Sequence, residues 1–173
     1  MFNFSSKQIN AILAAIQLKD LEKNNKEILL DMISDNHSEQ SRIELFVDGA
    51  ADLNSKTAGI GGVIYSNGSE LSTFSETLFE KTNNESEYLA LIKGIEVLLE
   101  LKLLNAEIFS DSELVVKQVS GEYKIKNARM KKLNSHLKNK LHQLHNWSLN
   151  HVKRDKNIRA DQLSKKGLDK AKR

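Results

Sequence analysis

The chain has no cysteine, which excludes a disulfide framework, a zinc–thiolate site and a thiol nucleophile. It also has no proline, an absence that points to no function. No apolar run reaches the roughly 18 residues that a membrane-spanning helix needs. The opening residues MFNFSSKQ show no basic stretch before an apolar one, so we expect neither a signal peptide nor a membrane span. The lack of cysteine fits a reducing compartment, and we expect a cytoplasmic protein.

Charge is distributed unevenly along the chain. Residues 41–121 carry 6 Lys or Arg against 13 Asp or Glu, whereas residues 122–173 carry 16 against 4. A basic C-terminal third can meet a phosphate backbone, and an acidic middle can hold cations. This pattern favours a protein that acts on nucleic acid with a metal, although a lysine-rich helix with a solvated face gives the same counts.

Hydrophobic periodicity predicts a helical N-terminal segment followed by an α/β domain. Residues 5–34 show helical spacing of apolar residues, with Asn24-Asn25 as the expected break between two helices. Residues 35–41 are polar and are expected to form a linker. We therefore divide the chain into a helical extension with its linker, residues 1–41, and a folded domain, residues 42–173.

The domain is predicted to begin with three hairpin-linked strands and to continue with strands reached through helices. Residues 43–52 are expected to form a strand that ends at Asp48-Gly49 and is followed by a turn. The other expected strands are 58–70, 71–78, 106–109 and 147–152, and the expected helices are 84–102, 112–119, 129–145 and 158–171. Asn67-Gly68 is a strong hairpin turn signal, and the glycines of GIGG at 59–62 are expected to permit close packing. This order predicts a mixed sheet with helices on its faces.

Acidic residues occur at the points where a ligand would bind. Asp48 is expected to close the first strand, and Asp111 follows the fourth. The carboxyl ends of neighbouring parallel strands meet at one crevice, and Glu87 lies in the first turn of the connecting helix. Taken singly, Asp48 fits a turn residue and Asp111 a helix cap. Together they predict one site.

Converging carboxylates stay ionised only if a cation neutralises them. All-oxygen ligands favour Mg²⁺ or Mn²⁺, and two such ions about 4 Å apart suit a displacement at phosphorus. A glycosidase site with two carboxylates is an alternative, but it leaves the basic C-terminal third without a role.

Five segments together resemble the type 1 ribonuclease H family, in particular its compact branch without a basic protrusion. They are FVDGAA at 46–51, GIGGVI at 59–64, TNNESEYLALIKGI at 82–95, IFSDSELVVKQVSGEYKIKN at 108–127 and HVKRDKNIRADQLSKKG at 151–167. The resemblance implies a ribonuclease H-like α/β fold, with a five-stranded mixed sheet in the order 3-2-1-4-5 and helices on both faces. It also implies endonucleolytic hydrolysis of the RNA strand of an RNA–DNA hybrid, which leaves a 5′-phosphate and a 3′-hydroxyl.

The resemblance also implies the catalytic residues. Four carboxylates are expected to bind two Mg²⁺ or Mn²⁺ ions, namely Asp48, Glu87, Asp111 and Asp161. Glu87 is the better match to the family glutamate, and Glu85 is the weaker one. His151, ten residues before Asp161, matches a histidine that assists proton transfer or product release. Without the resemblance, it is equally well explained as a strand-end histidine satisfied by a hydrogen bond.

Substrate contacts are implied at nine positions, namely Gly49, Thr82, Asn83, Asn84, Ser112, Lys124, Lys126, Arg154 and Asn157. Asn83 and Asn84 match a pair that reaches into the minor groove, where an amide can both donate and accept. Thr82 matches a residue that holds a phosphate of the DNA strand, although Thr82 or Asn83 can also cap the helix. Arg154 and Asn157 are expected to support the site from the loop before the last helix.

The chain departs from the family pattern in several places. Glu113 stands where some relatives have glutamine, and a carboxylate cannot donate to the substrate. Lysines and arginines are expected to replace the missing protrusion, namely Lys124, Lys126, Arg129, Lys131, Lys132, Lys138 and Lys140. Residues 1–40 have no counterpart and are expected to pack on the domain or to mediate self-association. The oligomeric state is not given by the sequence, and a monomer is favoured.

Two other functions remain open at this stage. One is a nuclease of the same fold that acts on double-stranded RNA or a recombination intermediate. The other is a catalytically silent nucleic-acid-binding module, although such a module has no use for four converging acids.

Overall fold

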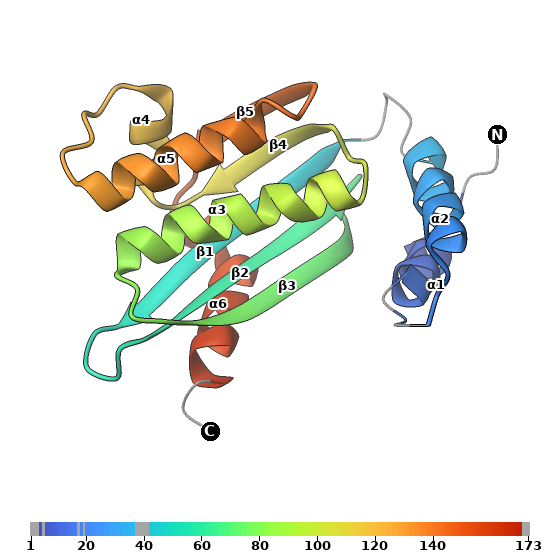
Figure 1. Cartoon of the computed structure of the whole chain (residues 1–173), viewed down its shortest axis with the longest axis horizontal. Helices are drawn as coiled ribbons and strands as arrows, with labels where there is room; N and C mark the ends of the chain where they lie inside the picture. The colour runs from blue at the N-terminus through green and yellow to red at the C-terminus, as the bar shows by residue number, and fades with distance from the viewer. Residues whose placement is uncertain (1–3, 5, 17, 19, 37–41, 171–173) are drawn as a thin grey trace.

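The computed structural model describes residues 4, 6–16, 18, 20–36 and 42–170 (Figure 1). Its strands are β1 (Ile43–Asp52), β2 (Thr57–Ser66), β3 (Ser69–Phe79), β4 (Asn105–Ser110) and β5 (Asn146–His151). Its helices are α1 (Ser6–Ile16), α2 (Lys23–Asn36), α3 (Asn83–Glu100), α4 (Glu113–Ser120), α5 (Ala128–Leu141), the short 3-10 helix η1 (Arg154–Lys156) and α6 (Ile158–Lys170). In this part of the chain, no helix combines the length and apolar character needed to cross a membrane.

The strands form one mixed sheet in the order β3-β2-β1-β4-β5. The first three strands pair antiparallel, and β4 joins β1 and β5 in parallel. The predicted fold class and strand order are therefore confirmed. Asn67 and Gly68 have φ values of 50° and 79°, which are the two left-handed positions that the expected Asn-Gly hairpin turn requires.

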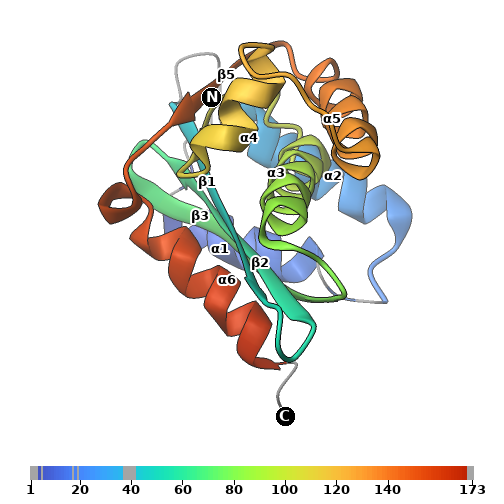
Figure 2. The ribbon, with the colours of Figure 1, turned by 90° about the vertical axis from the view of Figure 1, so that its left-hand side faces the viewer.

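Helices cover both faces of the sheet. In Figure 2, α3, α4 and α5 lie on one side and α6 lies on the other. The core between α3 and the sheet contains fully buried side chains, among them Leu45, Val47, Leu91, Ile95 and Ile108. Alternate residues of β1 and β4 point to this face, and helical spacing brings the residues of α3 onto it.

The sequence predicted that Asp48 closes the first strand, and this prediction is wrong. β1 continues to Asp52 because its antiparallel pairing with β2 extends to Asp52 and Thr57. The parallel pairing with β4 ends earlier, at Val47 and Ser110. Asp48 is therefore the first residue beyond the β1–β4 ladder, and it is held in place by the hairpin.

The expected break at Asn24-Asn25 is also wrong, because both asparagines lie in the first turn of α2. Asparagine destabilises a helix by only a few tenths of a kcal/mol relative to most residues. The apolar contacts of α2 can therefore outweigh the preference of two asparagines for a non-helical backbone. Ile33 of α2 is completely buried. The expected helix start at residue 5 and most of the linker, 37–41, lie outside the described residues.

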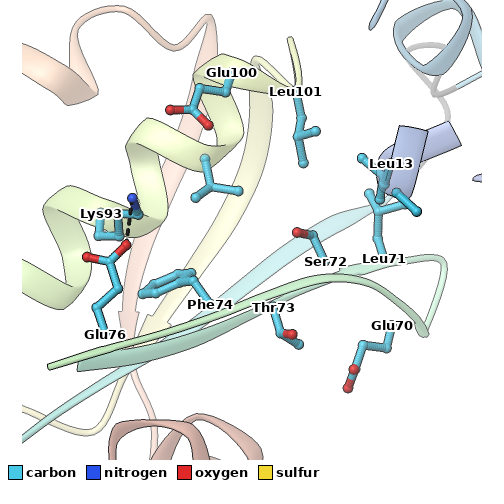
Figure 3. Close-up of a pocket in the computed structure, with 12 residues that line it drawn as sticks. Leu13, Glu70, Leu71, Ser72, Thr73, Phe74, Glu76, Lys93, Glu100 and Leu101 are labelled. Atoms are coloured by element: carbon cyan, nitrogen blue, oxygen red, sulfur yellow. Dashed lines mark ion pairs between the residues drawn. The ribbon is translucent and has the colours of Figure 1, made fainter. Parts of the chain in front are cut away.

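The two N-terminal helices lie beside the domain (Figure 1), where α1 contacts β3 and α2 contacts α1. Ile9 of α1 belongs to the main hydrophobic core, and Lys102 forms an ion pair with Asp31 of α2. A cavity of about 550 Å³ lies where α1, β3 and α3 meet. In Figure 3, Leu13 and Leu71 lie at one end of this cavity and the Lys93–Glu76 ion pair lies at the other.

Candidate active site

Three carboxylates converge where β1 and β4 diverge. Asp48, Glu87 and Asp111 each offer an oxygen, and these atoms all lie within 4.8 Å of one another. The parallel pairing of β1 with β4 brings Asp48 beside Asp111, and the first turns of α3 pass close to β1. The three residues come from separate segments of the chain, so their convergence depends on the tertiary fold.

Gly49 permits the approach of α3 and orients Glu87. A Cβ atom at position 49 would lie 2.3 Å from the carbonyl carbon of Ser86, so only glycine fits. The Gly49 N–H donates to Glu87 Oε2 at 3.2 Å. In this structure Gly49 therefore contacts the catalytic candidate Glu87 directly.

The pKa values of the buried carboxyls are strongly shifted. Burial, followed by repulsion from Asp48 and Asp111, raises the pKa of Glu87 to about 9. Burial also raises the pKa of Asp48 to about 6, against the effect of a hydrogen bond from Ser164. Both shifts have the physical cause expected of like charges held together in a low-dielectric site. A bound cation would remove this cost.

Asp161 lies in the first turn of α6, outside the cluster of three. Arg154 donates to its Oδ1 at 2.8 Å, and Lys165 donates to its Oδ2 at 2.6 Å. Partial burial would raise the pKa of Asp161, but the hydrogen bonds from Lys165 and Arg154 outweigh it and lower that pKa. Its negative charge still contributes to the raised pKa of Asp48.

Asn157 is 1% exposed and connects the last helix to the cluster. Its Nδ2 donates to Asp111 Oδ1 at 3.1 Å and to the Val47 carbonyl at 2.9 Å. Its Oδ1 is buried and has no hydrogen-bond partner among the described residues. Asn157 was predicted to contact the substrate. Its side-chain amide instead donates to two protein atoms, and one of these belongs to the candidate metal ligand Asp111.

The N-terminus of α3 forms a complete capping box. The Thr82 hydroxyl accepts from the Glu85 N–H, and the Glu85 carboxylate accepts from the Thr82 backbone N–H and hydroxyl. Glu85 also pairs with Arg129 at 3.4 Å. Thr82 therefore has the predicted capping role, and its hydroxyl hydrogen is directed at Glu85. Asn83 and Asn84 are exposed beside it.

A cavity of about 410 Å³ lies between the start of α3 and the segment that joins α4 to α5. Thr82, Asn84, Lys124, Lys126 and Arg129 are among the residues that line it. Several predicted substrate contacts thus share one basic cavity. Farther along α5, Lys140 is paired with Glu96 of α3 at 3.1 Å.

The remaining predicted residues lie along the rim of the site. His151 is exposed at the end of β5 and is in register with Ser110, next to Asp111 in the chain. Ser112 stands at the N-cap position of α4 but makes no capping bond with its side chain; its N–H donates to Ser110 Oγ at 3.1 Å. Glu113 pairs with Lys117 at 2.7 Å.

Sequence reasoning did not identify Ser164, which is fully buried on α6 and donates a hydrogen bond to Asp48. Its position three residues after Asp161, on the same face of a predicted helix, was the signal that could have found it.

Comparisons with known proteins give a consistent family. A family model described as reverse transcriptase-like matches residues 46–167. Ribonuclease HI of Halobacterium salinarum is 32% identical over 131 residues, which cover 75% of this chain and 66% of that protein. A bifunctional protein of Mycobacterium tuberculosis is 30% identical over 132 residues, which cover 75% of this chain and 36% of that protein.

Among solved structures, LC11-RNase H1 in complex with an RNA/DNA hybrid has a TM-score of 0.71 and 36% sequence identity. The match covers 76% of this chain and 100% of that one. The chain spans just under two thirds of the Halobacterium protein and about a third of the mycobacterial one. The match to the family model begins after α1 and α2.

Proposed function

The chain belongs to the type 1 ribonuclease H family, and on that premise we propose that it is an endonuclease that hydrolyses the RNA strand of RNA–DNA hybrids. The observation that carries the proposal is the convergence of Asp48, Glu87 and Asp111 within 4.8 Å. A similar protein, LC11-RNase H1, forms a complex with an RNA/DNA hybrid. The division into an extension, 1–41, and a catalytic domain, 42–173, is part of the same proposal.

The proposed cofactor is a pair of Mg²⁺ or Mn²⁺ ions. The donor set fits these ions, because all three converging ligands are carboxylate oxygens. Burial, and after it repulsion between the carboxylates, raises the pKa values of Glu87 and Asp48, and a bound cation would favour their ionised forms. Asp48, Glu87, Asp111 and Asp161 would hold the ions. When bound, two such ions activate a water and stabilise the attacking and leaving oxygens of a displacement at phosphorus.

The reaction balances as a simple hydrolysis. The water oxygen bonds to phosphorus, the bond from phosphorus to the 3′ oxygen breaks, and that oxygen takes up a proton. The products are a 5′-phosphate and a 3′-hydroxyl. We assign His151 to proton transfer or product release, because it is exposed at the end of β5 and pairs with Ser110, the residue before the candidate ligand Asp111.

Substrate recognition is assigned to the exposed residues around the start of α3. The amides of Asn83 and Asn84 can donate to and accept from a 2′-hydroxyl and a base edge in the minor groove. Lys124 and Lys126, in the basic cavity, would contact phosphates of the DNA strand. Because the Thr82 hydroxyl donates to Glu85, its predicted phosphate contact would require that hydrogen bond to rearrange.

Three remaining substrate contacts belong to the same proposal. Gly49 and Ser112 are next in sequence to the ligands Asp48 and Asp111, and Arg154 is mostly exposed beside Asp161. The protein is proposed to act as a monomer. The alternatives are a same-fold nuclease for double-stranded RNA or a recombination intermediate, and a binding module without activity.

Cleavage of a labelled RNA–DNA hybrid tests the proposal. Double-stranded RNA, single-stranded RNA and duplex DNA are assayed alongside it, each in Mg²⁺, Mn²⁺ and EDTA. We expect metal-dependent cutting of the RNA strand of the hybrid, lost in Asp48→Asn. Cutting of double-stranded RNA in preference to the hybrid would favour the first alternative. Binding that is insensitive to Mg²⁺, without cutting of any substrate, would leave the binding module.

A further inference from the structure

Ser164 of α6 has its hydroxyl directed at the active site. The side chain is fully buried, and its Oγ donates to Asp48 Oδ2. The same Oγ lies 2.9 Å from the carbonyl oxygen of Asp161. The hydroxyl has a single hydrogen, and an ionised carboxylate is a stronger acceptor than a neutral carbonyl. The hydrogen is therefore directed at Asp48.

The position of this hydroxyl is set by the packing of α6 on the sheet. A Cβ atom at Gly61 of β2 would lie 2.2 Å from the backbone nitrogen of Ser164. Gly61 is the residue that pairs with Asp48 across the β1–β2 ladder. The missing side chain at position 61 thus brings the backbone of α6 down beside Asp48, so that a side chain as short as serine reaches the carboxylate.

Other hydroxyls fasten α6 to the sheet without touching a carboxylate. Ser75 Oγ of β3 donates to the Leu163 carbonyl at 2.8 Å, and Thr77 Oγ1 donates to the Gly167 carbonyl at 2.5 Å. α6 is therefore held on the sheet independently of Ser164. Ser164 differs from these two residues in that its hydroxyl contacts a carboxylate.

We propose that Ser164 is a positioning residue that holds Asp48 in the orientation in which it binds metal. The inference rests on the proposed function, because it assumes that Asp48 is a metal ligand. A ligand held by a neighbouring donor keeps one rotamer, and the loss of such a donor typically weakens metal binding or activity by about 10- to 100-fold.

The test compares Ser164→Ala with Ser75→Ala. The Ser75 variant also removes a hydroxyl that connects α6 to the sheet, but this hydroxyl makes no hydrogen bond to a carboxylate. Binding of Mn²⁺ to the free protein is measured by the electron paramagnetic resonance of unbound Mn²⁺. The Mg²⁺ concentration for half-maximal cleavage and the KM for the hybrid are measured separately, with thermal unfolding in EDTA. Ser164→Cys, which is similar in size and a weak donor, gives a second variant in case alanine prevents folding.

We expect Ser164→Ala and Ser164→Cys to weaken Mn²⁺ binding and to raise the Mg²⁺ midpoint by about 10-fold, with the KM for the hybrid unchanged at saturating Mg²⁺. Ser75→Ala should lower thermal stability and leave both metal measurements unchanged. Metal affinity within about twofold of wild type in a folded Ser164 variant, or an equal loss in Ser75→Ala, would overturn the inference. If the wild type binds Mn²⁺ but cuts no hybrid, the proposed function fails, and the binding measurement still decides the role of Ser164.

Discussion

Asn157 donates a hydrogen bond to Asp111 over 3.1 Å, although 46 positions separate them in the chain. The same amide nitrogen donates to the carbonyl of Val47, the residue before Asp48. One buried side chain therefore connects β1 to the residue after β4 at the point where the pairing of the two strands ends, next to two of the proposed metal ligands.

Asn157→Ala should reduce both stability and catalysis. The substitution leaves the Val47 carbonyl and Asp111 without this donor, at a cost of about 1–3 kcal/mol of unfolding free energy. Asp111 also loses its orientation, and kcat should fall by about 10- to 100-fold. Asn134→Ala is the matched control, because Asn134 is also buried and donates to Tyr88 Oη and the Gln118 carbonyl. Equal kcat losses in both variants would mean that general destabilisation explains the effect.

Asp111→Asn should abolish cleavage and keep or tighten hybrid binding. Removing a metal ligand should reduce the cleavage rate by more than the roughly 100-fold that is lost when a residue hydrogen-bonded to a ligand is removed. Binding should not suffer, because the change removes one negative charge from an acidic cluster that repels phosphate. Fluorescence anisotropy with labelled hybrid in EDTA measures the binding. Loss of hybrid binding in this variant would count against the assignment of the site.

In EDTA, the free energy of unfolding should fall as the pH rises from about 5 to about 9. The pKa of Glu87 is raised from 4.5 to about 9 and that of Asp48 from 3.8 to about 6. Within this window the folded protein holds protons that the unfolded chain has released, so stability is lost as the pH rises. Urea unfolding at several pH values measures the slope.

Two comparisons separate this effect from other titrations. Glu87→Gln should flatten the slope, because an amide does not titrate. Mg²⁺ should restore more stability near pH 9 than near pH 6, because the carboxylates it binds must be deprotonated. A wild-type slope that Glu87→Gln leaves unchanged would contradict the assigned cause.

Replacing both Lys124 and Lys126 with alanine should raise KM for the hybrid and leave kcat unchanged. Each lost phosphate contact should reduce the slope of log affinity against log salt by about 0.9. Lys102→Ala is the control, because Lys102 pairs with Asp31 of the N-terminal extension. An unchanged salt dependence in the double variant would remove the basic cavity from the substrate path.

His151→Ala should lower kcat by about 100-fold if the imidazole transfers the proton. His145, which is also exposed and lies in the turn before β5, serves as the control. Single-turnover and steady-state rates are compared at saturating Mg²⁺. A deficit confined to the steady state would assign His151 to product release, and no deficit in either would exclude it from the reaction.

The sequence predicted the strand order and the four acids through its resemblance to the ribonuclease H family, and it predicted the helices of the domain through hydrophobic periodicity. The local signals were the apolar run at the start of β1, the helical spacing of apolar residues in α3, and the Asn67-Gly68 turn. The convergence of Asp48 with Asp111 also followed, because the order of the elements makes β1 and β4 parallel neighbours. The helix break at Asn24-Asn25 was wrong because helix propensity is weak beside tertiary packing.

Only the tertiary structure decided what orients the acids. The bond between Ser164 and Asp48 spans 116 positions, and that between Asn157 and Val47 spans 110. The contact of Ser164 depends on how closely α6 lies on β2. Gly59 and Gly61 permit this close approach because they have no side chain, but two glycines in a sequence do not show which segment will pack against them. Periodicity is a property of neighbouring residues, whereas a hydrogen bond between distant side chains depends on distances that arise only when the layers pack.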